Sequence, residues 1–181
     1  MKQGNASYIL RLTAILLAIT AITAALLGLV NQITADKIAA ITKEKTDAAM
    51  SAVLAAETYT EITDFTDETG MVDTMYQADD LGYVLQVTCS GSQGAITMMV
   101  GVDMAGAVTG ISIINHSETP GLGDVYAKDS AKGVAFRDSF VGLTGPLAAA
   151  DVDFMSGATV TANGVCTGVN AATACVAAYL G

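Results

Sequence analysis

One short segment near the C-terminus supplies the most reactive arrangement of side chains in the chain. Its three hydroxyl groups, those of Ser156, Thr159 and Thr161, flank the small pair Gly157-Ala158, which leaves the backbone uncovered. A hydroxyl oxygen is a nucleophile that can attack a phosphoanhydride and keep the phosphoryl group as an ester. The segment is therefore a candidate site for a phosphate-containing group.

The residues that follow predict a helix that begins near these hydroxyl groups. Apolar residues recur at steps of three and four positions: Val165, Val169, Ala172, Val176 and Tyr179. The first turn of a helix has unpaired backbone N–H groups, and together with the macrodipole they favour a bound anion such as phosphate. Serine and threonine are also ordinary N-cap residues. The spacing alone favours a capped helix start over a phosphate site.

A second loop, at residues 116–123, reads His-Ser-Glu-Thr-Pro-Gly-Leu-Gly. Pro120 and Gly121 predict a sharp turn, and Gly121 and Gly123 expose backbone N–H groups. Taken alone, this pattern is that of an ordinary turn. His116 is the only histidine of the chain. No nucleophile pattern accompanies it, so we expect a loop-structural or hydrogen-bonding role.

Three strand-like segments lead into this loop. Residues 82–88 and 95–102 are separated by a Ser/Gly turn, and the tight turn at 103–106 connects them to 107–115. Their alternating β-branched residues predict an antiparallel meander that places the loop accurately. Beyond the loop, residues 126–141 predict a short helix with a basic flank.

The N-terminal part predicts a membrane anchor. Residues 12–35 carry no charge, and a helix rising ~1.5 Å per residue would extend them over ~36 Å, enough to cross a ~30 Å hydrocarbon core. The run is longer than the apolar region of a cleaved signal peptide. We therefore expect a short polar N-terminus at 1–8, a transmembrane helix at 9–35, a helical stalk and acidic connecting segment at 36–80, and a domain at 81–181.

Charge and motif content exclude several function classes. The net charge is −10, and from residue 47 onward sixteen acidic side chains outnumber three basic ones, which argues against nucleic acid or anionic lipid as a partner. The three cysteines lack Cys-x-x-Cys spacing, so we expect no zinc or iron–sulfur site. The acidic run at 57–80 lacks the order of an EF-hand loop, so we expect a solvated, irregular or edge-strand segment there. Neither a dinucleotide-binding fingerprint nor a P-loop occurs.

The two loops together resemble the two signatures of one family. Asp-x-x-Ser-Gly-Ala-Thr at 153–159 is similar to the flavinylation motif of the FMN-binding domain. That domain is shared by the G subunit of the Rnf electron-transport complex and the C subunit of the sodium-pumping NADH:quinone reductase. Glu-Thr-Pro-Gly-Leu-Gly at 118–123 is similar to the second signature. The resemblance implies an α+β fold, with one N-terminal transmembrane helix followed by an FMN-binding domain of antiparallel sheet and flanking helices.

The resemblance also implies a cofactor and its site. In this family a flavin transferase uses FAD as donor and joins FMN, through its phosphate, to the threonine that closes Ser-Gly-Ala-Thr, which is Thr159 here. Thr161 lies outside that closing position. The other residues expected to contact the cofactor are Ser156, Gly157, Ala158, Glu118, Thr119, Gly121, Leu122 and Gly123.

A member of this family would be a membrane-anchored electron-transfer subunit of an Rnf-type ion-translocating ferredoxin:NAD+ oxidoreductase, without independent activity. Its partners would be other membrane proteins of the complex and, during maturation, the flavin transferase. The basic residues that flank the span do not decide its orientation. The resemblance places the domain on the extracytoplasmic side of the cell (inner) membrane. The alternatives are the C subunit of the quinone reductase and, in a different class, a membrane-anchored non-redox binding module.

Overall fold

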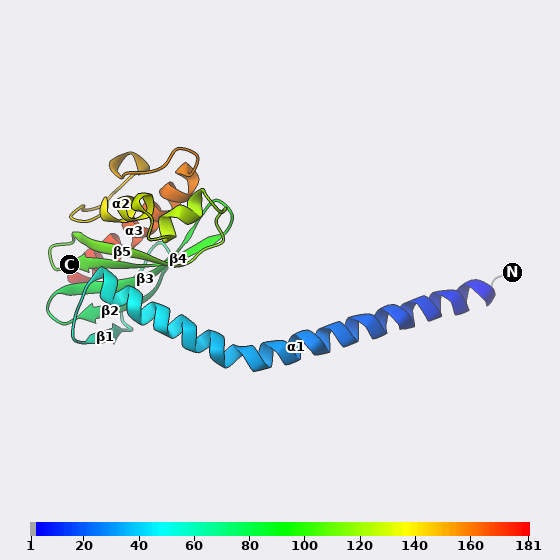
Figure 1. The fold of residues 1–181 in the computed structure, drawn as a ribbon. Coiled ribbons are helices and arrows are strands. Elements are labelled where there is room, and N and C mark those ends of the chain that lie inside the picture. The colour runs from blue at the N-terminus through cyan, green and yellow to red at the C-terminus, as the bar shows by residue number, and fades with distance from the viewer. Residues whose placement is uncertain (1–2) are drawn as a thin grey trace. The chain divides into compact units, whose positions relative to one another are not determined.

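The computed structural model describes residues 3–181, and the chain divides into two compact units, Met1–Glu44 and Lys45–Gly181. Helix α1 (Gln3–Val53) forms the described part of the first unit and continues into the second (Figure 1). The helix continues without a break past residue 35, into the region where we expected a helical stalk. The alanine-rich sequence beyond that point has high intrinsic helix propensity, so one helix continues to Val53.

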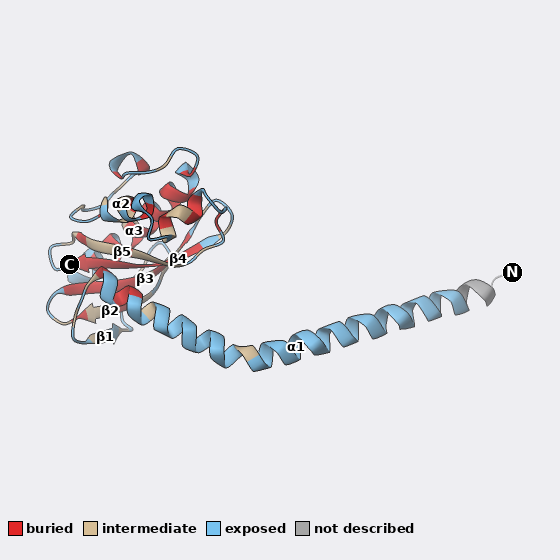
Figure 2. Cartoon of the chain, in the orientation of Figure 1, coloured by how far each residue is buried: buried red, intermediate tan, exposed pale blue. Residues whose placement is uncertain are grey.

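The first unit has the properties of a membrane-spanning helix. Every residue from Ser7 to Ile33 is exposed, although most are apolar (Figure 2). The hydroxyl groups of Thr20, Thr23 and Thr34 donate hydrogen bonds to carbonyl oxygens four residues earlier, at 2.8–3.0 Å. Such internal pairing is what polar groups need in lipid. Among the described residues, α1 is the one helix long and apolar enough to cross a membrane.

The second unit is built on one five-stranded antiparallel sheet in which the spatial order of the strands equals their order in the chain. The strands are β1 (Tyr59–Ile62), β2 (Val72–Ala78), β3 (Gly82–Ser90), β4 (Ala95–Asp103) and β5 (Val108–Asn115). Strands β3 to β5 confirm the predicted meander. The compact unit extends from Lys45 to Gly181 and so includes the last turns of α1 together with β1 and β2.

The acidic segment 57–80, which we expected to connect the stalk to the domain, is ordered and includes the edge strand β1. It holds β1 and β2, and its carboxylates close the turns beside them. Asp67 accepts hydrogen bonds from the backbone N–H groups of Met71 and Val72 at 2.7 and 2.8 Å. Asp79 accepts one from the N–H of Glu57 at 2.8 Å. The carboxylates thus pair with backbone donors, a use that the charge pattern does not reveal.

One face of the sheet carries the main core and is covered by α3 (Thr159–Leu180), which confirms the predicted C-terminal helix. Alternate strand residues such as Leu85 and Met98 meet the apolar side of α3, for example Val165. A Cβ on Gly164 would collide with the carbonyl oxygen of Ser90. Glycine at this position therefore lets the first part of α3 lie directly against the end of β3.

The opposite face of the sheet receives the last turns of α1, which belong to the same compact unit. Met50 and Val53 pack there against Val84 and Met99, in a second, smaller apolar cluster. The carbonyl oxygen of Val53 accepts a hydrogen bond from Oγ1 of Thr109 on β5, at 2.7 Å. The end of α1 is therefore joined to the sheet by both apolar and polar contacts.

Short helices fill the connection between β5 and α3: η1 (Gly123–Ala127), α2 (Ala131–Asp138) and η2 (Ala149–Asp151). The short helix that we predicted within residues 126–141 is α2, and η1 precedes it. Lys128 is extended and ends η1. Ser130 begins α2, because its side chain accepts a hydrogen bond from the N–H of Gly133 at 3.2 Å, the usual role of an N-cap serine.

Candidate functional site

The N-terminus of α3 is open, in contrast to the capped start that the spacing alone favoured. Its N-cap residue is Ala158, which makes no side-chain hydrogen bond to the helix. Among the residues that the structure describes, none accepts a hydrogen bond from the N–H groups of Thr159, Val160 or Thr161. These donors and the helix macrodipole together form a site suited to a phosphate group.

The two threonines of this first turn lie in opposite environments. Thr159 is the first residue of α3 and its side chain is exposed. Thr161, two positions later, is 2% exposed, and its hydroxyl donates a hydrogen bond to Oε2 of Glu118. A bulky phosphate ester can therefore reach the hydroxyl of Thr159 but not that of Thr161.

The residues before Thr159 leave room for a ligand. Ser156 and Gly157 are exposed, and Ala158 is buried against the core. Gly157 has φ +92°, in the left-handed region that favours glycine. A Cβ at Gly157 would lie 3.6 Å from Cδ2 of Leu122. The segment that resembles a flavinylation motif and the loop that resembles the second signature are therefore adjacent in space.

Most of that second loop is accessible. Thr119, Gly121 and Leu122 are exposed, with Leu122 at 43%, whereas Gly123 is buried and begins η1. An exposed leucine beside an open helix N-terminus offers an apolar surface on which a flat aromatic ring can pack. These residues fit the binding of FMN: donors for its phosphate, a nucleophilic hydroxyl, and an apolar contact.

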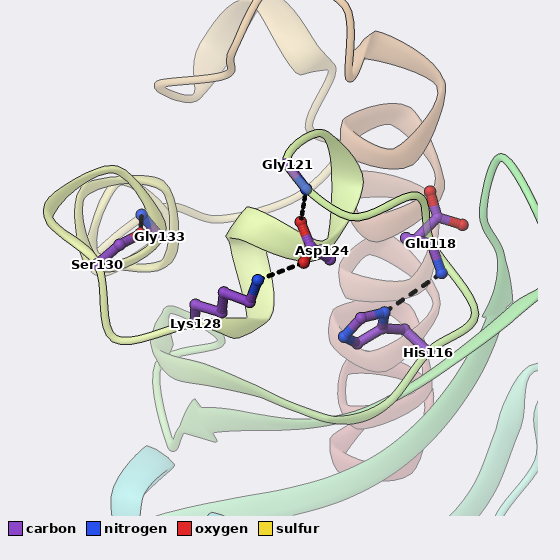
Figure 3. Close-up of polar contacts among 7 residues, drawn as sticks. All are labelled: His116, Glu118, Gly121, Asp124, Lys128, Ser130 and Gly133. Atoms are coloured by element: carbon purple, nitrogen blue, oxygen red, sulfur yellow. Dashed lines mark hydrogen bonds and ion pairs between the residues drawn. The ribbon is translucent and has the colours of Figure 1, made fainter.

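The Asp124 carboxylate holds this loop in its conformation (Figure 3). It accepts hydrogen bonds from the N–H of Gly121 at 2.6 Å and from Nζ of Lys128 at 2.5 Å. The hydrogen bond from Lys128 is the largest cause of a lowered pKa for Asp124. Nδ1 of His116 accepts a weaker bond from the N–H of Glu118 at 3.3 Å. His116 thus has the hydrogen-bonding role in the loop that the sequence suggested.

Glu118 differs from its neighbours in the loop because its carboxylate points into the protein. It is 6% exposed. Its Oε1 accepts hydrogen bonds from the N–H groups of Ser92 and Gln93, at 2.9 and 3.0 Å. Its Oε2 accepts the bond from Thr161. Its hydrogen bonds therefore connect three segments of the protein around the start of α3.

Two contributors to the site were not predicted from the sequence. The first is the β3–β4 turn at Ser92 and Gln93, whose Ser/Gly composition indicated a turn but not its neighbours. The second is Tyr126, whose hydroxyl accepts a hydrogen bond from the N–H of Met155 at 2.9 Å. The Tyr126 ring is stacked on Phe136 with ring centroids 3.7 Å apart. This places η1 beside the segment before Thr159, where Lys132 and Phe154 also line a cavity of about 360 Å³.

The cysteines take no part in this site. All three are buried and free: Cys89, Cys166 and Cys175. Burial raises the pKa of Cys89 and of Cys166 to about 11. We therefore assign these thiols to the core.

Comparison with known proteins gives a consistent result. Residues 91–174 match the FMN-binding domain family, a range that includes both loops and most of α3. The chain is 34% identical over 105 residues to the G subunit of a proton-translocating ferredoxin:NAD(+) oxidoreductase complex from Clostridium ljungdahlii, and the match covers 56% of each chain.

Two other relatives match over nearly their whole length. The G subunit of an ion-translocating oxidoreductase complex from Methanosarcina acetivorans is 29% identical, over 99% of this chain and all of that protein. The G subunit of a Na(+)-translocating ferredoxin:NAD(+) oxidoreductase complex from Acetobacterium woodii is 27% identical, over 90% of this chain and 88% of that protein. The similarity thus includes the N-terminal helix as well as the domain.

Proposed function

We propose that this chain, which carries an FMN-binding domain and is related to the G subunits of ion-translocating oxidoreductase complexes, is a membrane-anchored electron-transfer protein with FMN bound covalently to Thr159. The observation that carries the proposal is the open first turn of α3. It combines an exposed hydroxyl at Thr159 with three backbone N–H groups that have no acceptor among the described residues.

Attachment requires little from the chain beyond a well-placed hydroxyl. The Thr159 oxygen attacks the phosphorus on the FMN side of the FAD pyrophosphate. A P–O ester bond forms, the anhydride bond to the second phosphorus breaks, and AMP leaves while the hydroxyl proton is released. A flavin transferase supplies FAD and any general base. Gly157, which lacks a side chain, and the exposed Ser156 leave the approach to Thr159 uncovered.

Once formed, the phosphodiester lies where the helix favours a negative charge. The N–H groups of the first turn and the macrodipole of α3 stabilise the ester oxygens. Leu122 supplies an apolar contact for the ring, and the N–H of Gly121 remains with Asp124 to keep the loop in place. FMN itself provides the one- and two-electron redox chemistry, while the protein determines its position and surroundings.

The rest of the chain fits a protein that transfers electrons between partner proteins. Helix α1 holds the domain at a membrane, and other membrane proteins of the complex would donate and accept the electrons. We place the domain on the extracytoplasmic side. A covalent tether is useful there, because FMN lost from the protein could not readily be replaced. Two of the relatives named above are subunits of ferredoxin:NAD(+) oxidoreductase complexes, and we propose the same complex type here.

Intact mass measurement tests the attachment directly. The full-length chain, produced together with a flavin transferase and purified in detergent, should gain the mass of FMN less one water molecule. It should also give a fluorescent band on a denaturing gel, and peptide mapping should place the added mass on Thr159. A colourless chain of unmodified mass from such cells would leave only a non-redox binding module. The proteins that co-purify distinguish an Rnf-type complex from a quinone reductase.

A further inference from the structure

The first turn of α3 contains two threonine hydroxyls, and the protein treats them differently. Thr159 is exposed, whereas Thr161 is buried and donates its hydroxyl hydrogen to Glu118. Two threonine hydroxyls are chemically equivalent as nucleophiles, so chemistry alone would not choose between them. The choice must come from the surroundings of each hydroxyl.

The Glu118 carboxylate occupies a site formed for it by three separate segments. A Cβ at Gly91, in the β3–β4 turn, would collide with its Oε1. A Cβ at Gly123, at the start of η1, would lie 2.5 Å from Oε2 of Glu118 and from Oγ1 of Thr161. Glycine at these two positions therefore lets the carboxylate sit between the turn and α3.

The hydrogen bonds of this carboxylate fix the position of α3 as well as its own. A carboxylate oxygen only accepts hydrogen bonds. The N–H groups of Ser92 and Gln93 and the hydroxyl of Thr161 are therefore all donors to Glu118. Two bonds hold the β3–β4 turn and one holds the first turn of α3, so the loop residue Glu118 links both to each other.

We propose that Glu118 is a positioning residue that withholds the Thr161 hydroxyl from flavin transfer and orients the first turn of α3, so that Thr159 alone is presented. The inference rests on the proposed attachment of FMN to this turn. Glu118 acts through its protein contacts rather than by touching the flavin, because its carboxylate is buried and faces Thr161 and the turn.

The first test needs no flavin. Hydrogen exchange of the full-length, unmodified chain in detergent is compared between the wild type and Glu118→Ala. We expect peptides that contain Ser92 and Gln93, and those from the first turn of α3, to exchange at least about tenfold faster in the variant. Asp129→Asn is the control, because Asp129 is an exposed carboxylate of the same connection that pairs with Arg137. It should leave these peptides unchanged.

The second test identifies which threonine carries the flavin. Both variants are produced with the flavin transferase, and modified peptides are quantified by mass spectrometry. We expect Glu118→Ala to lose at least about tenfold in modification rate at Thr159 and to acquire flavin on Thr161, which the wild type lacks. Asp129→Asn should be modified on Thr159 only. A purely structural role of Glu118 would lower the yield without moving the flavin to a second threonine.

Two substitutions of Thr161 provide a second test if Glu118→Ala does not fold. Thr161→Ser retains the donor and should behave as the wild type, whereas Thr161→Val should slow modification of Thr159 and loosen the same peptides. Unchanged exchange together with wild-type modification of Thr159 in Thr161→Val and Glu118→Ala would overturn the inference. Absence of flavin from the wild type would instead refute the proposed attachment, while the exchange experiment would still decide the role of Glu118.

Discussion

The carbonyl oxygen of Val53, the last residue of α1, accepts a hydrogen bond from Oγ1 of Thr109 on β5 at 2.7 Å. Gly101 and Gly110 make this approach possible, since a Cβ on either would come within 3.1 Å of Val53 backbone atoms. The helix that carries the candidate membrane span therefore ends on the sheet of the second compact unit rather than in a free linker.

Removing this hydrogen bond should destabilise the domain. Thr109→Val leaves the buried Val53 carbonyl without its partner, and we expect a loss of about 1–3 kcal/mol in the free energy of unfolding. Urea unfolding of the full-length chain in detergent measures this change in stability. Thr109→Ser should recover most of the lost free energy of unfolding. The exposed strand residue Thr60 provides a control, because Thr60→Val should change the stability by no more than about 0.5 kcal/mol. Equal losses in the two valine variants would contradict a specific contact with α1.

Substitution of Thr159 should separate modification from folding. Thr159→Ala removes the nucleophilic oxygen, so we expect complete loss of covalent flavin in an intact-mass measurement. Because Thr159 is exposed and its side chain makes no cap, the free energy of unfolding should change by no more than about 0.5 kcal/mol. Thr159→Ser keeps a hydroxyl and should be modified, more slowly. Flavin of unchanged amount on Thr159→Ala would refute the assignment.

Gly157 should be sensitive to any side chain, for a backbone reason. At φ +92° an alanine is strained, which costs about 1–2 kcal/mol, while its Cβ would make only ordinary van der Waals contact with Leu122 at 3.6 Å. We expect Gly157→Ala to lower stability by that amount and to slow flavin attachment, because the chain before Thr159 must shift. Ser156→Ala, at an exposed neighbouring position, is the control for stability. Equal stability of the two variants would show that the strain is relieved locally.

The loop that carries Leu122 should lose order in acid. The hydrogen bond from Lys128 lowers the pKa of Asp124 from its ordinary value of 3.8. A group with a lowered folded-state pKa contributes stability above its unfolded pKa and loses it as the pH falls through the folded value. The difference in unfolding free energy between the wild type and Asp124→Asn should therefore be full near pH 7 and shrink below about pH 4. Denaturant unfolding at several pH values checks this, and a difference that grows in acid would contradict it.

Local sequence determined several elements of this fold and the position of both loops in the chain. An uncharged run from residue 12 to 35 is sufficient to predict a membrane helix, and the alternating segments before residue 115 are sufficient to predict β3, β4 and β5. The two glycine-containing loops were recognisable because their residue types lie next to each other in the chain. Local patterns left the segment of β1 and β2 open between a solvated, irregular or edge-strand structure, because they do not show that its carboxylates pair with backbone donors of the turns.

Only the tertiary structure decided what each residue of the site does. Thr159 and Thr161 are alike as residue types, and the packing of α3 on β3 exposes the first and buries the second. Glu118 meets Thr161 across 43 positions and Ser92 across 26, distances in sequence over which no periodic pattern carries information. Helix propensity and turn chemistry act over a few residues, so they set the elements. Burial and hydrogen-bond partners depend on the packing of distant segments, and these determine which hydroxyl is left accessible.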